Sequence, residues 1–112
     1  HLHPRLYGAF PYVLRKYVRE QPVFSLEEAV HKMTGKAASA FRLRDRGVLA
    51  VGKAADLTIF KADTIRDRAT FTDPIRFPEG IEHVNGVLTV SHGRHTGVRK
   101  GRVLTKMNGY IV

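Results

Sequence analysis

The chain changes character within residues 45–60, which read DRGVLAVGKAADLTIF. Before this stretch, apolar residues recur at the spacing that places them on one face of a helix. From this stretch onward, glycine separates short apolar runs, which is typical of β-strands and their turns. The strongest strand is expected at residues 57–60. Because helices precede strands, the sequence predicts an α+β fold, with N-terminal helices followed by a small β unit.

The β unit is expected to be mainly antiparallel. An Asn-Gly pair at residues 85–86 separates two apolar runs, 81–84 and 87–90. Such a pair is a strong hairpin signal, because Asn and Gly tolerate the left-handed backbone of a tight turn. We expect residues 92–93 to end this hairpin and residues 103–104 to add a last strand.

A loop is expected between these strands, over residues 63–80. Asp73-Pro74 marks a turn within it. Three apolar residues of the loop are predicted to pin it over a hydrophobic surface: Phe71, Ile75 and Phe77.

Two helices and a shorter one are expected upstream. Pro11 is predicted to open the first helix, where its missing N–H costs nothing, and Pro22 to stop it. Ser25 and Glu28 have the spacing of a capping box, in which each side chain binds the backbone N–H of the other. Gly35 is expected to end that second helix in a left-handed conformation, and residues 36–41 to form the shorter helix.

Composition limits the class of protein. The chain has 112 residues, of which 43% are hydrophobic, so a small core is expected. It contains no Cys, which excludes disulfides and thiolate metal sites. We expect a cytoplasmic protein, because no apolar run approaches the ~20 residues of a membrane span and no signal peptide is present. A chain that begins with His1 rather than Met is expected to be a piece of a longer protein.

The chain is strongly basic, with a net charge of +9. This charge raises the possibility of a polyanionic partner. A basic run near the end carries Arg94, Arg99, Lys100 and Arg102, but no aromatic residues alternate with these charges to stack on bases. We therefore do not expect nucleic acid as a partner, although a stand-alone basic binding module stays open as an alternative.

No complete catalytic or metal site is expected in the chain. His1 and His3 could share a metal if they lay on a strand, but Pro4 follows directly and no third ligand is evident. We therefore assign no catalytic residue and no metal ligand. Asp56 is expected to cap a turn by accepting backbone N–H groups, since no matching nucleophile or base accompanies it.

Several segments nevertheless resemble those of N-acyl-D-amino-acid deacylases, or D-aminoacylases, of the metal-dependent amidohydrolase superfamily. The similar segments follow one another in the expected order and read HPRLYGAFP at 3–11, SLEEAVHKMT at 25–34, DRATFTDP at 67–74 and PEGIE at 78–82.

This resemblance implies a parent enzyme with a (β/α)₈ barrel and a small β-sandwich. In such an enzyme a zinc ion activates water and an Asp acts as acid and base, and these groups would precede His1. Residues 1–45 would be a helical segment that closes the barrel, and residues 46–112 the C-terminal part of the sandwich. The chain would be the C-terminal portion of a zinc-dependent amidohydrolase of N-acyl-D-amino acids, and inactive alone.

The resemblance also implies two candidate substrate-binding residues. His3 and Arg5 would line the rim of the pocket, and Arg5 could bind a substrate carboxylate through its guanidinium fork. Helix faces meant for an absent barrel would make the isolated chain self-associate. A related amidohydrolase that acts on a cyclic amide remains a further alternative.

Overall fold

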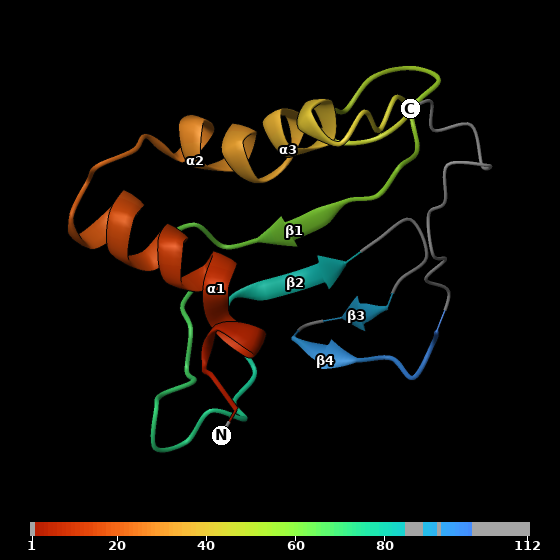
Figure 1. The fold of residues 1–112 in the computed structure, drawn as a ribbon. Coiled ribbons are helices and arrows are strands. Elements are labelled where there is room, and N and C mark those ends of the chain that lie inside the picture. The colour runs from red at the N-terminus through yellow and green to blue at the C-terminus, as the bar shows by residue number, and fades with distance from the viewer. Residues whose placement is uncertain (1, 85–88, 92, 100–112) are drawn as a thin grey trace.

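The computed structural model describes residues 2–84, 89–91 and 93–99 and shows helices followed by a small sheet (Figure 1). The helical part consists of α1 (Arg5–Val13), the π-helix η1 (Leu14–Glu20), α2 (Leu26–Met33) and α3 (Gly35–Ala40). The strands are β1 (Thr58–Phe60), β2 (Ile81–Val84), β3 (Val90–Ser91) and β4 (Arg94–His95). The sequence-based expectation of helices before strands is confirmed.

The described strands form one sheet in the order β1-β2-β3-β4, and each neighbouring pair is antiparallel. Residues 81–84 pair antiparallel with the next strand, as predicted, but the register differs. Val84 lies opposite Val90, so the pairing encloses residues 85–89 rather than the Asn-Gly pair alone. The Asn-Gly pair at 85–86 and the strand expected at 103–104 lie outside the described residues. The sequence analysis missed β4, which pairs with β3 around the turn that contains Gly93.

The first helix begins earlier than predicted, so Pro11 lies inside α1 and does not open it. The helix starts where the backbone N–H groups of Leu6 and Tyr7 donate to the carbonyl oxygens of His3 and Pro4. Pro11 lacks an N–H and cannot donate to the preceding turn. The helix instead continues with the wider π-helical pattern and ends at Glu20, before Pro22, as predicted.

The capping box of α2 is confirmed. The Glu28 backbone N–H donates to Ser25 Oγ at 3.1 Å, and the Ser25 backbone N–H donates to Glu28 Oε2 at 3.0 Å. The role predicted for Gly35 is wrong, because Gly35 is the first residue of α3 and Thr34 separates the two helices. The Thr34 backbone departs from helical geometry, with φ −120° and ψ −89°, and its hydroxyl donates to the Val30 carbonyl oxygen at 2.7 Å.

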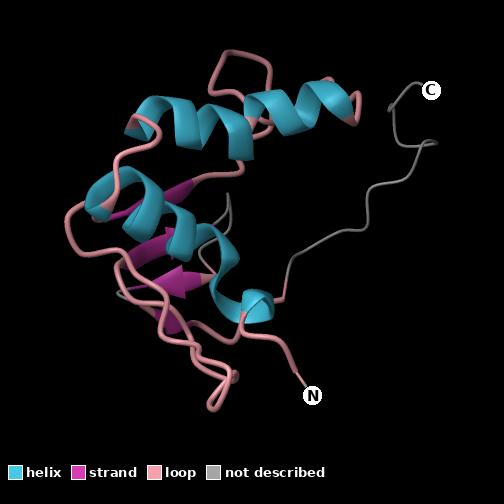
Figure 2. Cartoon of the chain, turned by 60° about the vertical axis from the view of Figure 1, so that its left-hand side comes forward, coloured by secondary structure: helices cyan, strands magenta, loops and turns pink. Residues whose placement is uncertain are grey.

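One small core joins the helices to the sheet. Leu14, Ala29 and Ile65 form its buried cluster, and partly buried residues from η1, α2, β1 and β2 pack around them. Figure 2 shows the helices gathered on one side of the strands. Among the described residues, no helix combines the length and apolarity that a bilayer span requires.

The loop over residues 61–80 is buried at other residues than predicted, although Phe71 and Phe77 contact the rings of His3 and Tyr7. Phe71, Ile75 and Phe77 are exposed, whereas Ile65 and Ala69 are buried. The Ile65 backbone N–H donates to the Lys61 carbonyl oxygen at 2.8 Å, so the chain turns directly after β1 and inserts Ile65 into the core. The three exposed residues lie farther along the loop, beyond the reach of that core.

Candidate functional site

The two sequence-predicted site residues, His3 and Arg5, lie together at the start of α1. The Arg5 backbone N–H donates to His3 Nδ1 at 3.1 Å, which defines Nδ1 as the acceptor atom of the ring. Both side chains are exposed. His3 thus satisfies one of the free N–H groups at the helix start, and Arg5 keeps its guanidinium accessible.

Two aromatic contacts connect this segment to the loop over residues 61–80. The rings of His3 and Phe71 meet edge to face with centroids 5.1 Å apart, and those of Tyr7 and Phe77 do so at 5.5 Å. His3 and Tyr7 are about one helical turn apart. The loop therefore contacts the start of α1 at two points about one helical turn apart.

A third contact brings the loop backbone against the helix. A Cβ added to the buried Gly8 would lie 2.8 Å from Asp67 Cβ. Any side chain at this position would displace the loop, so glycine permits the close approach.

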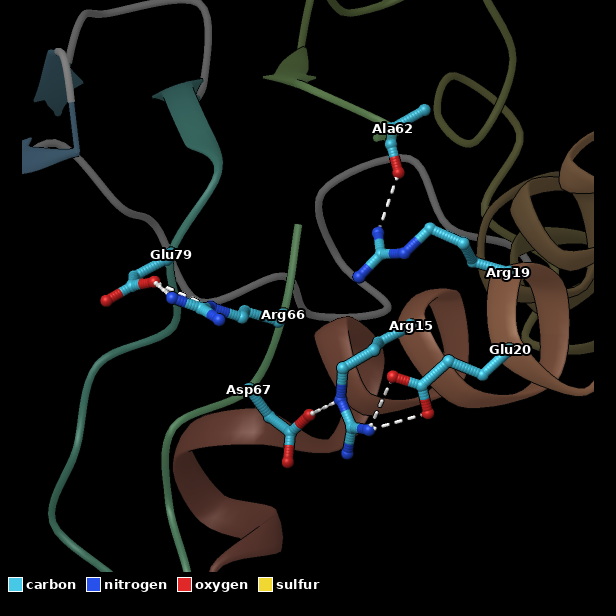
Figure 3. A network of polar contacts seen from close by, with 7 residues as sticks. All are labelled: Arg15, Arg19, Glu20, Ala62, Arg66, Asp67 and Glu79. Carbon is cyan, nitrogen blue, oxygen red and sulfur yellow. Dashed lines mark hydrogen bonds and ion pairs between the residues drawn. The ribbon is translucent and has the colours of Figure 1, made fainter. Parts of the chain in front are cut away.

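Arg15 lies at the centre of a network of charged groups (Figure 3). Its Nε donates to Asp67 Oδ1 at 2.8 Å, and Nη1 donates to the two Glu20 carboxylate oxygens at 3.0 and 2.8 Å. Bonds to Asp67 and then Glu20 raise the pKa of Arg15 above its ordinary value. The π-helical register of η1 brings Arg15 and Glu20 to the same side, so one guanidinium connects the helix to the loop.

The base of the loop is closed by a second pair of residues, also drawn in Figure 3. Arg66 and Glu79 exchange both backbone hydrogen bonds, at 3.1 and 2.9 Å, and the Arg66 Nε donates to Glu79 Oε2 at 2.7 Å. The bond from Arg66 is the largest cause that lowers the pKa of Glu79. Gly80 follows with φ +84°, and a Cβ there would lie 2.6 Å from Ile65 Cα. The loop base therefore fits only with glycine at position 80.

The other side chains that could cap a turn or bind a metal are scattered. The Asp56 carboxylate forms an ion pair with Arg46, where the sequence predicted a backbone cap. His95 is exposed, and its Nδ1 accepts a hydrogen bond from the Gly97 backbone N–H at 2.9 Å. His1 and His92 lie outside the described residues.

No metal centre is assembled within the part of the chain that the structure describes. There, no three side chains of His, Asp or Glu come together in a group that could hold a metal ion. The described residues therefore do not fit a zinc site, and we assign no chemical step through zinc to them.

This chain is similar in sequence to a known protein family. The Amidohydrolase family profile matches residues 2–96. The chain is 48% identical over 108 residues to N-acyl-D-glutamate deacylase of Alcaligenes xylosoxydans xylosoxydans, and 49% identical over 107 residues to N-acyl-D-aspartate deacylase of that organism. These alignments cover 95% and 93% of this chain but only 22% and 21% of the relatives. The chain thus spans about a fifth of the length of the curated relatives it matches.

A more distant relative has a different name. A dihydroorotase of Lactobacillus acidophilus is 34% identical over 91 residues, which are 77% of this chain and 21% of that protein.

Solved structures of deacylases share the fold. A D-aminoacylase variant in complex with copper chloride has a TM-score of 0.85 and 45% identity, over 91% of this chain and 22% of that one. The N-acyl-D-glutamate deacylase of Bordetella bronchiseptica, complexed with zinc and a phosphonate that mimics the tetrahedral intermediate, has a TM-score of 0.73 and 42% identity. That match covers 83% of this chain and 19% of the other.

Proposed function

The chain belongs to the amidohydrolase family, and from this premise we propose that it is part of a hydrolase that cleaves the amide bond of N-acyl-D-amino acids. The observation that carries this proposal is the similarity, near half of all aligned residues, to deacylases of two different D-amino acids. The shared fold with D-aminoacylase supports the same reaction class.

We propose that the reacting groups belong to the rest of that hydrolase. In this proposal, residues 1–45 close a (β/α)₈ barrel and residues 46–112 contribute to a small β-sandwich. Zinc and the acid–base residue are supplied by the barrel, so the chain alone is inactive. The order of helices and strands supports the division into these two parts. The proposal that the reacting groups lie elsewhere is supported by the coverage, because the chain spans only about a fifth of the length of its relatives.

Within this hydrolase, His3 and Arg5 form part of the pocket rim and Arg5 binds the carboxylate of the substrate. A guanidinium matches a carboxylate because it can donate two parallel hydrogen bonds. Three features support this role: Arg5 is exposed, its backbone N–H is held by His3 Nδ1, and the His3 ring is braced by Phe71.

A panel of substrates tests the reaction class. The full-length protein that contains this chain is assayed with N-acetyl-D-glutamate, N-acetyl-D-aspartate, N-acetyl-D-methionine and their L enantiomers. Hydrolysis of at least one D compound, with much slower hydrolysis of its L enantiomer, is expected. Equal rates on both enantiomers, or no hydrolysis of any D compound, would refute the proposal.

Cyclic-amide hydrolysis is the second candidate function. It is favoured by the similarity to a dihydroorotase, which is lower than the similarity to the deacylases. Dihydroorotate is therefore included in the panel, and turnover of this compound alone would select the second candidate. The matches do not favour a stand-alone basic module.

Kinetics of an Arg5→Ala variant of the full-length protein test the rim. Removing a charged hydrogen-bonding partner is expected to raise KM about tenfold to a hundredfold, with a smaller change in kcat. Arg94→Ala, which removes an exposed arginine from β4, serves as the matched control and should leave KM unchanged. A variant at Arg5 with unaltered KM and kcat would exclude the role.

A further inference from the structure

Phe71 is a large apolar side chain that remains 79% exposed in the loop over residues 61–80. Within this chain it contributes little to the core. Its ring instead meets the ring of His3 edge to face at 5.1 Å, the geometry that the charge distribution of aromatic rings favours.

The backbone around Phe71 is fixed. The Thr70 backbone N–H donates to the Asp73 carbonyl oxygen at 3.0 Å, and the Asp73 backbone N–H donates to Thr70 Oγ1 at 3.0 Å. These bonds close the loop tip across Phe71. The base is closed by the Arg66–Glu79 bridge and anchored by the buried Ile65. The loop can therefore hold the Phe71 ring at a defined position.

From these contacts we propose that Phe71 is a positioning residue for substrate binding, which acts on Arg5 through His3. The contacts form a short series: Phe71 fixes the plane of the His3 ring, and His3 Nδ1 accepts the Arg5 backbone N–H at 3.1 Å. This inference rests on the proposed function, because it assigns the carboxylate of an N-acyl-D-amino acid to Arg5.

The physical effect is preorganisation. The lone pair of Nδ1 lies in the plane of the imidazole ring, so the Arg5 N–H must lie near that plane to donate to it. Without Phe71, the exposed His3 ring can rotate away from that plane, and the first turn of α1 loses a cap. Arg5 then samples more conformations, and the substrate must restrict them on binding, which weakens affinity without altering the chemistry.

A double-mutant cycle in the full-length protein tests this series. Phe71→Ala is expected to raise KM for the best N-acyl-D-amino acid about twofold to tenfold, the factor that corresponds to one aromatic edge contact, with kcat nearly unchanged. Phe71→Tyr, which keeps the aromatic ring, should have a KM close to that of the wild type. In an Arg5→Ala background, Phe71→Ala should change KM little, because residues of one coupled series are not additive.

The matched control is Phe41→Ala. Phe41 is 78% exposed, like Phe71, but lies at the end of α3. The Phe41→Ala substitution should leave both KM and kcat unchanged. The positioning role is overturned if Phe71→Ala alters KM by the same factor with and without Arg5, or if its effect equals that of Phe41→Ala.

A readout without activity separates this inference from the proposed function. The side-chain protons of His3, assigned with a His3→Gln variant, should change their NMR shifts in Phe71→Ala because the ring current of Phe71 is lost. They should not change in Phe41→Ala. If the wild-type protein hydrolyses no N-acyl-D-amino acid, the proposed function fails and the substrate assignment falls with it. If the His3 shifts coincide in wild type and Phe71→Ala, the bracing contact itself is refuted.

Discussion

Arg15 donates its Nε–H to Asp67 Oδ1 at 2.8 Å and thereby connects two segments that lie 52 residues apart in the sequence. The side chains are 26% and 14% exposed, so water screens this ion pair less than it screens a pair on the open surface. Because the Asp67 loop also carries the rings that contact His3 and Tyr7, this bond holds the helix and the loop in one arrangement.

The first prediction concerns this bond. Asp67→Asn should lower the free energy of unfolding by about 1–3 kcal/mol, because the part-buried Arg15 loses its strongest partner. Urea unfolding of the dilute chain, followed by circular dichroism, measures the change.

Glu20→Gln is the matched control for that variant. Glu20 binds the same guanidinium but is 48% exposed, so its contribution should stay below about 1 kcal/mol. A loss from Glu20→Gln that equals or exceeds the loss from Asp67→Asn would show that the Asp67 bond does not dominate the network.

The second prediction concerns the N-terminus of α2. Ser25→Ala removes the hydroxyl that accepts the Glu28 backbone N–H and should lower stability by about 1 kcal/mol. Ser39→Ala, an exposed position inside α3, should instead be neutral or slightly stabilising, since alanine favours helices. Unchanged urea midpoints for Ser25→Ala would contradict the capping role.

The third prediction concerns pH. Arg66 lowers the pKa of Glu79 below its ordinary value of 4.5. A carboxyl with a lowered pKa in the folded state stabilises the fold above its unfolded-state pKa and loses this effect as the pH falls through the folded-state pKa. The stability difference between wild type and Glu79→Gln should therefore be present at neutral pH and disappear in acid below that value.

Chemical denaturation of both proteins across this pH range measures the effect. Since Glu79 is an exposed group, the difference should also shrink at high salt. A difference that persists unchanged after Glu79 is protonated would mean that the charge has no part in closing the loop.

The fourth prediction concerns the isolated chain. Leu6 and Phe10 lie one turn apart on α1 and are 64% and 63% exposed. We expect such apolar positions to cause self-association, so the sedimentation coefficient should rise with concentration. Replacing both residues by Gln should reduce this rise, whereas Phe41→Gln, at an exposed position just after the end of α3, should reduce it less. Wild-type chain that sediments as a monomer at every concentration would contradict the expectation.

Local signals in the sequence predicted local structure. The capping box of Ser25 and Glu28 is decided by residues within one turn, so its spacing was sufficient. The strand at residues 81–84 was likewise found from its apolar run. Pro11 was misleading because the helix already begins where Leu6 and Tyr7 donate to the carbonyl oxygens of His3 and Pro4, and it continues through Pro11.

Contacts between distant segments were not predictable in this way. An apolar residue in a loop can cover a core or meet a single ring, and composition does not distinguish the two for Phe71. His3 and Arg5 were identified from the family resemblance. The contact of Phe71 with the His3 ring, and the hydrogen bond from Arg5 to that ring, became visible only in the structure. Gly8 gave no local signal either, since its importance lies in the approach of Asp67.

The most direct test of the central claim compares this chain with the full-length protein in one assay. Both are incubated with Zn²⁺ and N-acetyl-D-methionine, N-acetyl-D-glutamate or N-acetyl-D-aspartate, and the release of acetate is followed. We predict release by the full-length protein and none by this chain, which places the reacting groups outside it. Release by this chain alone, or no release by the full-length protein on any of the three compounds, would contradict the claim.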